Sequence, residues 1–201
     1  MSLLIQKLIN SIVQIIIFSA IPFVWWLVTS RNKCPFLEWI GLKKISNAGS
    51  RKVYYLIIGI SLAFLLVSVF ILNSLKEADM AISEFSELGI NAFPAILIYA
   101  VFNTSLPEEI FFRGFLLKRL ADKFGYNVGN ITQAVIFGLL HGVMFFSSAG
   151  VLKAILIIVF TGAVGWCIGY VNEKEASGSI LPGWFIHALA NIFSGLYSAF
   201  F

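Results

Sequence analysis

The sequence predicts an all-α fold, a polytopic transmembrane helix bundle with about six membrane helices. Of its 201 residues, 59% are hydrophobic and 12% are charged, whereas a typical soluble domain is about 25% charged. The mean hydropathy is +0.92. The charges are confined to short islands between apolar runs, and an uncharged run of about 18 residues can cross the bilayer as a helix. We therefore expect a single integral membrane domain over residues 1–201.

Six uncharged runs define the expected membrane segments in chain order. They are Leu8–Ser30, Val53–Leu75, Leu88–Pro107, Phe124–Leu152, Ala154–Asn172 and Ala176–Phe201. We expect the first run to be a retained helix, because it is too long for the apolar region of a signal peptide and no small-x-small cleavage site closes it before Arg31. The runs lack the two-residue alternation of lipid-facing strands, which excludes a β-barrel.

The third segment carries signs of an interruption. Ser105 followed three residues later by Glu108 fits a capping box, and proline is tolerated in the first turn of a helix. The pattern predicts that Pro107 starts a new helix, or kinks a long one, that runs to about Asp122. This broken or extra helix would carry Glu108 and Glu109. Irregular backbone at membrane depth is tolerated where it lines a cavity or packs on protein.

Lysine and arginine are distributed unevenly among the islands. Eleven of them lie between residues 31 and 52, between 113 and 123, and at 174, whereas Lys7, Lys76 and Lys153 lie on the other side. The positive-inside rule therefore places the loops 31–52, 113–130 and 172–179 in the cytoplasm and both termini outside. Because these charges lie at membrane edges, where anionic lipids attract them, we expect membrane lipids and no nucleic acid as partners.

Polar groups inside the apolar segments are the candidates for a functional site, since such groups are costly in a membrane. The chain has two histidines, His141 and His187, and they fall in the fourth and sixth segments. His187 and Asn191 are four residues apart, so both lie on one helix face. Phe137 and His141 have the same spacing, which positions the aromatic ring to shield the imidazole.

Two glutamates follow Pro107 directly. Glu109 and Arg113 are four residues apart and can form an ion pair on one helix face. Glu108 points about 100° away from Glu109 around the helix, so it remains available for other chemistry. The simplest alternative for Glu109 and Arg113 is a purely structural ion pair.

Together these residues resemble the motifs of a known family. Glu108-Glu109-x-x-x-Arg113, Phe137-x-x-x-His141 and His187-x-x-x-Asn191 are similar to the three motifs of the CPBP intramembrane proteases. That family includes the eukaryotic type II CAAX prenyl endopeptidase and the bacterial Abi proteins. Order and spacing agree across residues 105–195, within a motif-bearing core of about 91–201. The first hundred residues carry no family marker beyond hydropathy.

The resemblance implies an endopeptidase that works inside the membrane. Glu108 would act with His141 to activate a water molecule. His187 and Asn191 would stabilise the oxyanion that forms when the water attacks a peptide carbonyl. The site would be supported by the side chains of Glu109, Arg113 and Phe137.

A metal centre is the alternative for the same side chains. One glutamate and two histidines are a possible zinc set with an open position for water. However, the H-E-x-x-H pattern is absent from the sequence, Asn191 is a poor zinc ligand, and the resemblance implies a metal-independent mechanism. We therefore expect no cofactor and no metal. No G-x-S-x-G motif predicts a serine hydrolase, and the membrane aspartate pair of an aspartyl protease is missing.

The expected partner is a peptide or a lipidated-protein substrate, either a prenylated CAAX peptide or the precursor of a bacterial peptide. The short loops suggest a protein of a bacterial cell membrane. A second hypothesis is a non-enzymatic immunity or scaffold protein of the Abi type that binds a peptide partner in the same pocket. A proton-coupled transporter is a weaker third hypothesis, because the sequence shows no inverted repeat. The sequence leaves the oligomeric state open.

Overall fold

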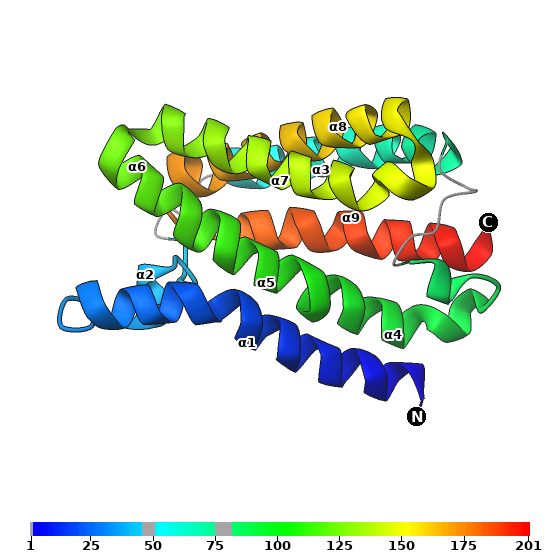
Figure 1. Cartoon of the computed structure of the whole chain (residues 1–201), viewed down its shortest axis with the longest axis horizontal. Helices are drawn as coiled ribbons and strands as arrows, with labels where there is room; N and C mark the ends of the chain where they lie inside the picture. Colours follow the sequence, from blue (N-terminus) through cyan, green and yellow to red (C-terminus); the bar gives the residue numbers. More distant parts are fainter. Residues whose placement is uncertain (1, 46–50, 75–81) are drawn as a thin grey trace.

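The computed structural model describes residues 2–45, 51–74 and 82–201, and every regular element in these ranges is helical. Figure 1 shows the elements as a bundle of roughly aligned helices. The α-helices are α1 (Leu3–Thr29), α2 (Phe36–Trp39), α3 (Arg51–Ser74), α4 (Phe93–Ile98), α5 (Leu106–Glu108), α6 (Lys118–Phe124), α7 (Tyr126–Ala149), α8 (Val151–Tyr170) and α9 (Leu181–Phe200). Short 3₁₀ turns are η1 (Ser83–Phe85) and η2 (Gly89–Ala92), and π-helical segments are η3 (Tyr99–Ser105), η4 (Glu109–Leu117) and η5 (Val171–Glu175).

The predicted all-α membrane bundle is confirmed. Five helical spans in the described part of the chain are long and apolar enough to cross a membrane: α1, α3, Gly89–Phe124, α7 and Val151–Glu175. The sixth predicted segment forms α9, a helix of 20 residues that is not among the five. Helix α9 packs between α3 and the Gly89–Phe124 span. Helix α9 contains the polar residues His187 and Asn191, which lower its mean hydropathy.

The Gly89–Phe124 span runs through Pro107 as one helical stretch of 36 residues. Of the two alternatives for Pro107, a long helix is therefore the one observed. The predicted capping box at Ser105 is wrong: Ser105 has helical backbone angles (φ −63°, ψ −47°) and makes no side-chain cap. Proline lacks the N–H that a regular helix needs. The chain meets this irregularity with π-helical turns on both sides of Pro107.

The prediction that residues 113–130 form a loop is also wrong, because this stretch is helical except at Gly125. Arg113 is fully buried within η4, and the helix continues to the end of α6. Only Gly125 separates α6 from α7, with a φ of +86° that favours glycine. The positive charge at position 113 needs no contact with water because Glu109 lies beside it in the same helix.

Helices α7 and α8 approach each other closely because small residues line their contact. A Cβ atom added to Gly138 would lie 2.5 Å from the backbone oxygen of Ile158 and 3.2 Å from Gly162. Gly169 faces the side chain of Asn130, and Gly165 faces Phe137. Close approach of this kind is expected where small residues line a contact between membrane helices.

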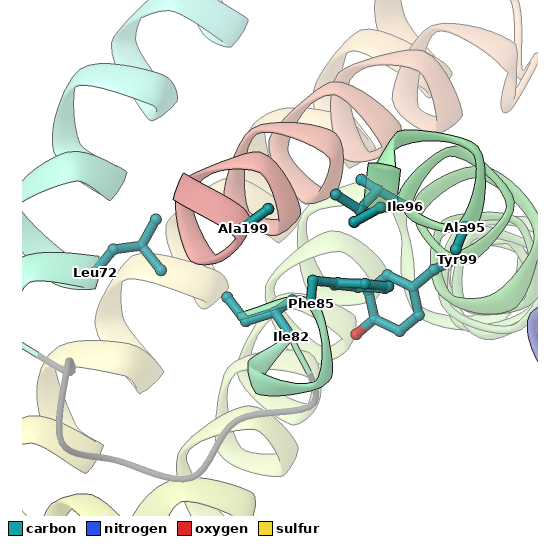
Figure 2. Close-up of a cluster of buried hydrophobic side chains, with 8 residues drawn as sticks. Leu72, Ile82, Phe85, Ala95, Ile96, Tyr99 and Ala199 are labelled. Atoms are coloured by element: carbon teal, nitrogen blue, oxygen red, sulfur yellow. The ribbon is translucent and has the colours of Figure 1, made fainter. Parts of the chain in front are cut away.

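A hydrophobic cluster holds the C-terminal end of α9 against α4. Phe85 is fully buried, and its ring packs edge-on against Tyr99 with 5.4 Å between ring centroids. Ile96 and Ala199 belong to the same cluster. Figure 2 shows Phe85 and Tyr99 lying together between the end of α9 and the start of the long helix. This packing fixes how α9 lies along the helix that carries the glutamates.

The opposite end of the bundle is joined by polar contacts between distant loops. The backbone N–H of Ile180 donates to the carbonyl of Gly41 over 2.8 Å. The Ser179 hydroxyl donates to the carbonyl of Lys43 over 2.6 Å. The start of α9 is thereby tied to the segment after α2, while both chain termini lie at the other end (Figure 1).

Candidate active site

The Glu109–Arg113 pair forms the buried base of the site. Arg113 Nη1 lies 3.0 Å from Glu109 Oε1, and both side chains have no solvent exposure. The spacing of four residues places them on one face of the helix, as the sequence predicts. Removing one partner of a buried ion pair costs about 3–5 kcal/mol, because the other charge stays buried without compensation. We therefore expect this pair to hold its geometry tightly.

His187 lies between the two glutamates. Its Nδ1 is 3.2 Å from Glu109 Oε1, and its Nε2 is 3.6 Å from Glu108 Oε2. Because a carboxylate oxygen only accepts, Nδ1 of the imidazole donates to Glu109. His187 thus joins α9 to the Glu-Glu motif of the long helix.

The two glutamates have different surroundings. Glu109 has no exposed surface and contacts both Arg113 and His187. The side chain of Glu108 is 19% exposed, and its Oε2 has no hydrogen-bond partner among the described residues. Glu109 Oε2 also lacks a hydrogen-bond partner there, but the Glu109 side chain is fully enclosed, whereas Glu108 has surface that a water molecule can reach.

The ring of Phe137 is the point where the three motifs meet. The guanidinium carbon of Arg113 lies 4.3 Å from the ring centroid, a cation–π distance. The ring of His141 lies 4.3 Å away and that of His187 5.8 Å away, centroid to centroid. Phe112 packs edge-on against the same ring at 5.0 Å. The packing of Phe137 against His141 agrees with the position predicted for it.

His141 is half-buried on α7, and its Nδ1 lies 2.9 Å from the backbone oxygen of Phe137. Since a carbonyl oxygen accepts, Nδ1 carries the hydrogen and Nε2 is left with its lone pair. Within the described ranges, no direct hydrogen bond joins His141 to Glu108. His141 therefore reaches the site through its contact with Phe137.

Asn191 faces the turn of the long helix that precedes the glutamates. Its Nδ2 donates to Thr104 Oγ1 over 2.9 Å and to Ser105 Oγ over 3.1 Å. These two hydroxyls were not among the predicted site residues. Their spacing was a signal for them, because Thr104 and Ser105 lie four residues before Glu108 and Glu109 and hence on the same helix faces.

The comparison with protein-family models identifies the region that holds all of these side chains. The family described as type II CAAX prenyl endopeptidase Rce1-like matches residues 90–193, which is more than half of the chain. The chain belongs to this family. No curated protein and no solved structure matches the chain in the other two comparisons. Membership of the Rce1-like family, together with the five apolar helices, makes this an integral membrane protein of the CAAX-type intramembrane protease class.

The Rce1-like region also contains a polar network that the sequence did not single out. Gln133 Nε2 donates to Asn130 Oδ1 over 2.8 Å and to the carbonyl of Gly165 over 2.9 Å. Asn130 Nδ2 donates to the carbonyl of Trp166 over 3.0 Å. Both side chains are fully buried. They hold α7 to α8 behind Arg113, and their spacing of three residues on α7 could have indicated a shared face.

In this Rce1-like protein, the described residues include no group of three or more histidine, cysteine, aspartate or glutamate side chains arranged to hold a metal ion. Cys34 and Cys167 are free thiols on different elements. The site consists of two carboxylates, two imidazoles, an amide, a guanidinium and two hydroxyls. This set can move a proton at Glu108 and donate hydrogen bonds from α9.

Proposed function

We propose that this protein is an endopeptidase that hydrolyses a peptide bond of a membrane-associated or prenylated substrate without a metal. The observation that carries the proposal is the position of His187. Both of its ring nitrogens face carboxylates within 3.6 Å, inside the region that matches the Rce1-like family. A histidine on one helix and two glutamates on another thus lie together in one largely buried cluster.

Glu108 is the proposed general base. It is the glutamate with exposed surface, whereas Glu109 is fully enclosed and held by Arg113 and His187. A general base must reach the proton that it removes, directly or through one water. His141 would assist by accepting a hydrogen bond from the same water through Nε2, since Nδ1 is engaged by a backbone carbonyl. Phe137 would keep the imidazole in this orientation.

The proposed reaction is a hydrolysis with ordinary proton balance. The water oxygen bonds to the carbonyl carbon of the substrate while its proton passes to Glu108. The carbonyl oxygen becomes an oxyanion that His187 and Asn191 would stabilise, and a positioned donor of this kind is worth about 3–4 kcal/mol. The C–N bond then breaks, and the leaving nitrogen takes the proton from Glu108. The products are a carboxylic acid and an amine, which ionise in water to a carboxylate and an ammonium group.

The proposed substrate class follows from the environment of the site. Glu108 and His187 lie inside a bundle with five helical spans apolar enough to cross a membrane, so we propose that a peptide enters from the bilayer or its rim. A prenyl group or a hydrophobic segment would keep such a peptide in the membrane. We propose either a prenylated CAAX peptide or a membrane-associated peptide precursor, with the site opening toward the cytoplasmic leaflet of a bacterial cell membrane.

Replacing the proposed base tests the function directly. Glu108→Gln keeps the shape of the side chain but removes its ability to accept a proton, so we expect the loss of all measurable cleavage. The measurement is mass spectrometry of membrane peptides from cells that carry the wild-type or the variant protein. Peptide products should appear only with the wild type.

Glu38→Gln is the matched control. Glu38 is exposed on α2, so this substitution makes the same chemical change away from the site. We expect wild-type products from it. Wild-type products from Glu108→Gln would contradict the proposed mechanism. If neither protein yields products and a cellular phenotype survives Glu108→Gln, the non-enzymatic immunity or scaffold hypothesis gains support.

A further inference from the structure

The side-chain amide of Asn191 is fully engaged by the long helix. An asparagine amide nitrogen carries two hydrogens, and in the structure one is donated to Thr104 Oγ1 and the other to Ser105 Oγ. The proposed function asks the same nitrogen to donate to a substrate oxyanion. The nitrogen would then need three hydrogens, one for each hydroxyl and one for the oxyanion, but it carries two. One of the hydroxyls must therefore lose its hydrogen bond with Asn191 when substrate is present.

The orientation of the amide is set by Thr104. The Thr104 hydroxyl lies 3.1 Å from the carbonyl of Tyr99 and 3.3 Å from that of Ala100, and it donates to this pair. Since its hydrogen is directed at the helix backbone, its oxygen faces Asn191 as an acceptor. An acceptor attracts the amide nitrogen and repels the amide oxygen. Thr104 therefore determines which end of the Asn191 side chain faces the helix.

Ser105 differs from Thr104 in this respect. The Ser105 side chain is completely buried, and within the described ranges its hydroxyl donates no hydrogen bond. Its oxygen can turn away from Asn191 without breaking a second interaction. The bond to Ser105 is also the longer of the two, at 3.1 Å against 2.9 Å. The Asn191 hydrogen that points at Ser105 is thus the one that can form a hydrogen bond with a substrate instead.

We propose that Thr104 is a positioning residue that acts through Asn191, and that the substrate oxyanion takes the place of Ser105 as acceptor of the second Asn191 hydrogen. This inference rests on the proposed function. Thr104 touches neither the substrate nor the water. It keeps the amide nitrogen turned toward the site, so that the donor is in place before the oxyanion forms.

The first experiment measures the amide itself and needs no substrate. In the full-length protein labelled with ¹⁵N-asparagine, the NH₂ signals of Asn191 are assigned by their absence in Asn191→Ala. Thr104→Val replaces the hydroxyl by a methyl group of similar size, so we expect shifted NH₂ signals and faster hydrogen exchange. Thr104→Ser restores the hydroxyl and should restore both. Unchanged NH₂ signals in Thr104→Val would overturn the proposal.

The second experiment measures cleavage of an internally quenched farnesylated CAAX peptide in proteoliposomes. We expect Thr104→Val to lower kcat about 10–100-fold with KM within about twofold of the wild type, since misplacement of a catalytic group by about 1 Å can cost a hundredfold. Thr104→Ser should recover most of the rate. A loss in Thr104→Val that Thr104→Ser does not recover would indicate a packing role and contradict the proposal.

Thr161→Val is the matched control. The Thr161 hydroxyl donates to a backbone carbonyl of its own helix, Ile157 at 2.7 Å, on α8, so the same substitution there should leave kcat and the Asn191 signals unchanged. The two proposals fail in different ways. Full activity in Thr104→Val with inactive Glu108→Gln overturns only the role of Thr104, whereas full activity in Glu108→Gln overturns the proposed function. The NMR result decides the position of Asn191 in either case.

Discussion

The guanidinium of Arg113 occupies space that a single small residue leaves open. Gly165 on α8 has no side chain, and a Cβ atom at this position would lie 3.1 Å from Arg113 Nη2 and 3.3 Å from Phe137. Because Phe137 also contacts His141 and His187, a displacement at Gly165 would pass to both histidines. Gly165 is thus part of the support of the site although it has no side chain.

A larger residue at Gly165 tests this dependence. We expect Gly165→Val to lower cleavage at least tenfold and to reduce stability by about 1–3 kcal/mol, as overpacked cores generally do. The measurements are the peptide-cleavage rate and Tm in detergent. Gly59→Val on α3 is the control, because a Cβ atom there meets nothing within 4 Å. Equal effects of the two substitutions would contradict the role given to Gly165.

At the scale of elements, the long helix places its polar groups through irregular turns. Its π-helical segments η3 and η4 lie on either side of Pro107 and hold Thr104, Ser105, Glu109 and Arg113. A π-helical turn is rare and is often found at functional sites. A regular α-helix would rotate the residues after Pro107 relative to those before it. The distances from the hydroxyls to Asn191 and from the glutamates to His187 would then change.

Pro107→Ala tests this function of the irregular turns. Alanine supplies the missing N–H and favours regular helix, so we expect an equal or higher Tm together with at least a tenfold lower cleavage rate. Pro94→Ala is the matched control, since Pro94 lies in the first turn of α4 where no N–H is needed. A lower Tm with full activity in Pro107→Ala would show that the proline stabilises the helix without shaping the site.

At the scale of the whole molecule, the polar contacts and the charges divide the bundle into two ends. One end holds the α2 segment, α6 and η5, where Lys118 pairs with Glu173 and donates to the carbonyl of Gly178. The other end holds both termini (Figure 1). Lys7 at this end is buried and paired with Glu84, and Lys76 lies outside the described residues. Because Arg113 is buried, it does not act as a loop charge. Ten of the eleven predicted cytoplasmic cations remain to set the orientation of the protein in the membrane.

Cysteine labelling tests the orientation that these charges predict. In a variant without Cys34 and Cys167, a membrane-impermeant maleimide added to intact cells should label Phe201→Cys at the C-terminus. It should label Leu37→Cys, on the exposed face of α2, only after lysis. The physical reason is the excess of lysine and arginine at the α2 end. The reverse pattern would place the α2 end outside and contradict the cytoplasmic opening of the site.

Much of the site could be predicted because its motifs lie within single helices. The pairing of Glu109 with Arg113 and the contact of Phe137 with His141 follow from a spacing of four residues. The bond between Asn191 and Thr104 could not be predicted, because it joins residues 87 positions apart and depends on how α9 crosses the long helix. The prediction of a loop at residues 113–130 was wrong because a hydropathy value counts the charge of Arg113 but not the partner, Glu109, that neutralises it.

The sequence by itself therefore determined the membrane bundle, the candidate side chains and the family motifs, since hydropathy and helical periodicity are local properties of the chain. The tertiary structure decided how these side chains divide their contacts. Packing of α9 against the long helix placed His187 between both glutamates and directed both hydrogens of Asn191 to Thr104 and Ser105. These contacts depend on distances between helices, which no spacing along the chain records.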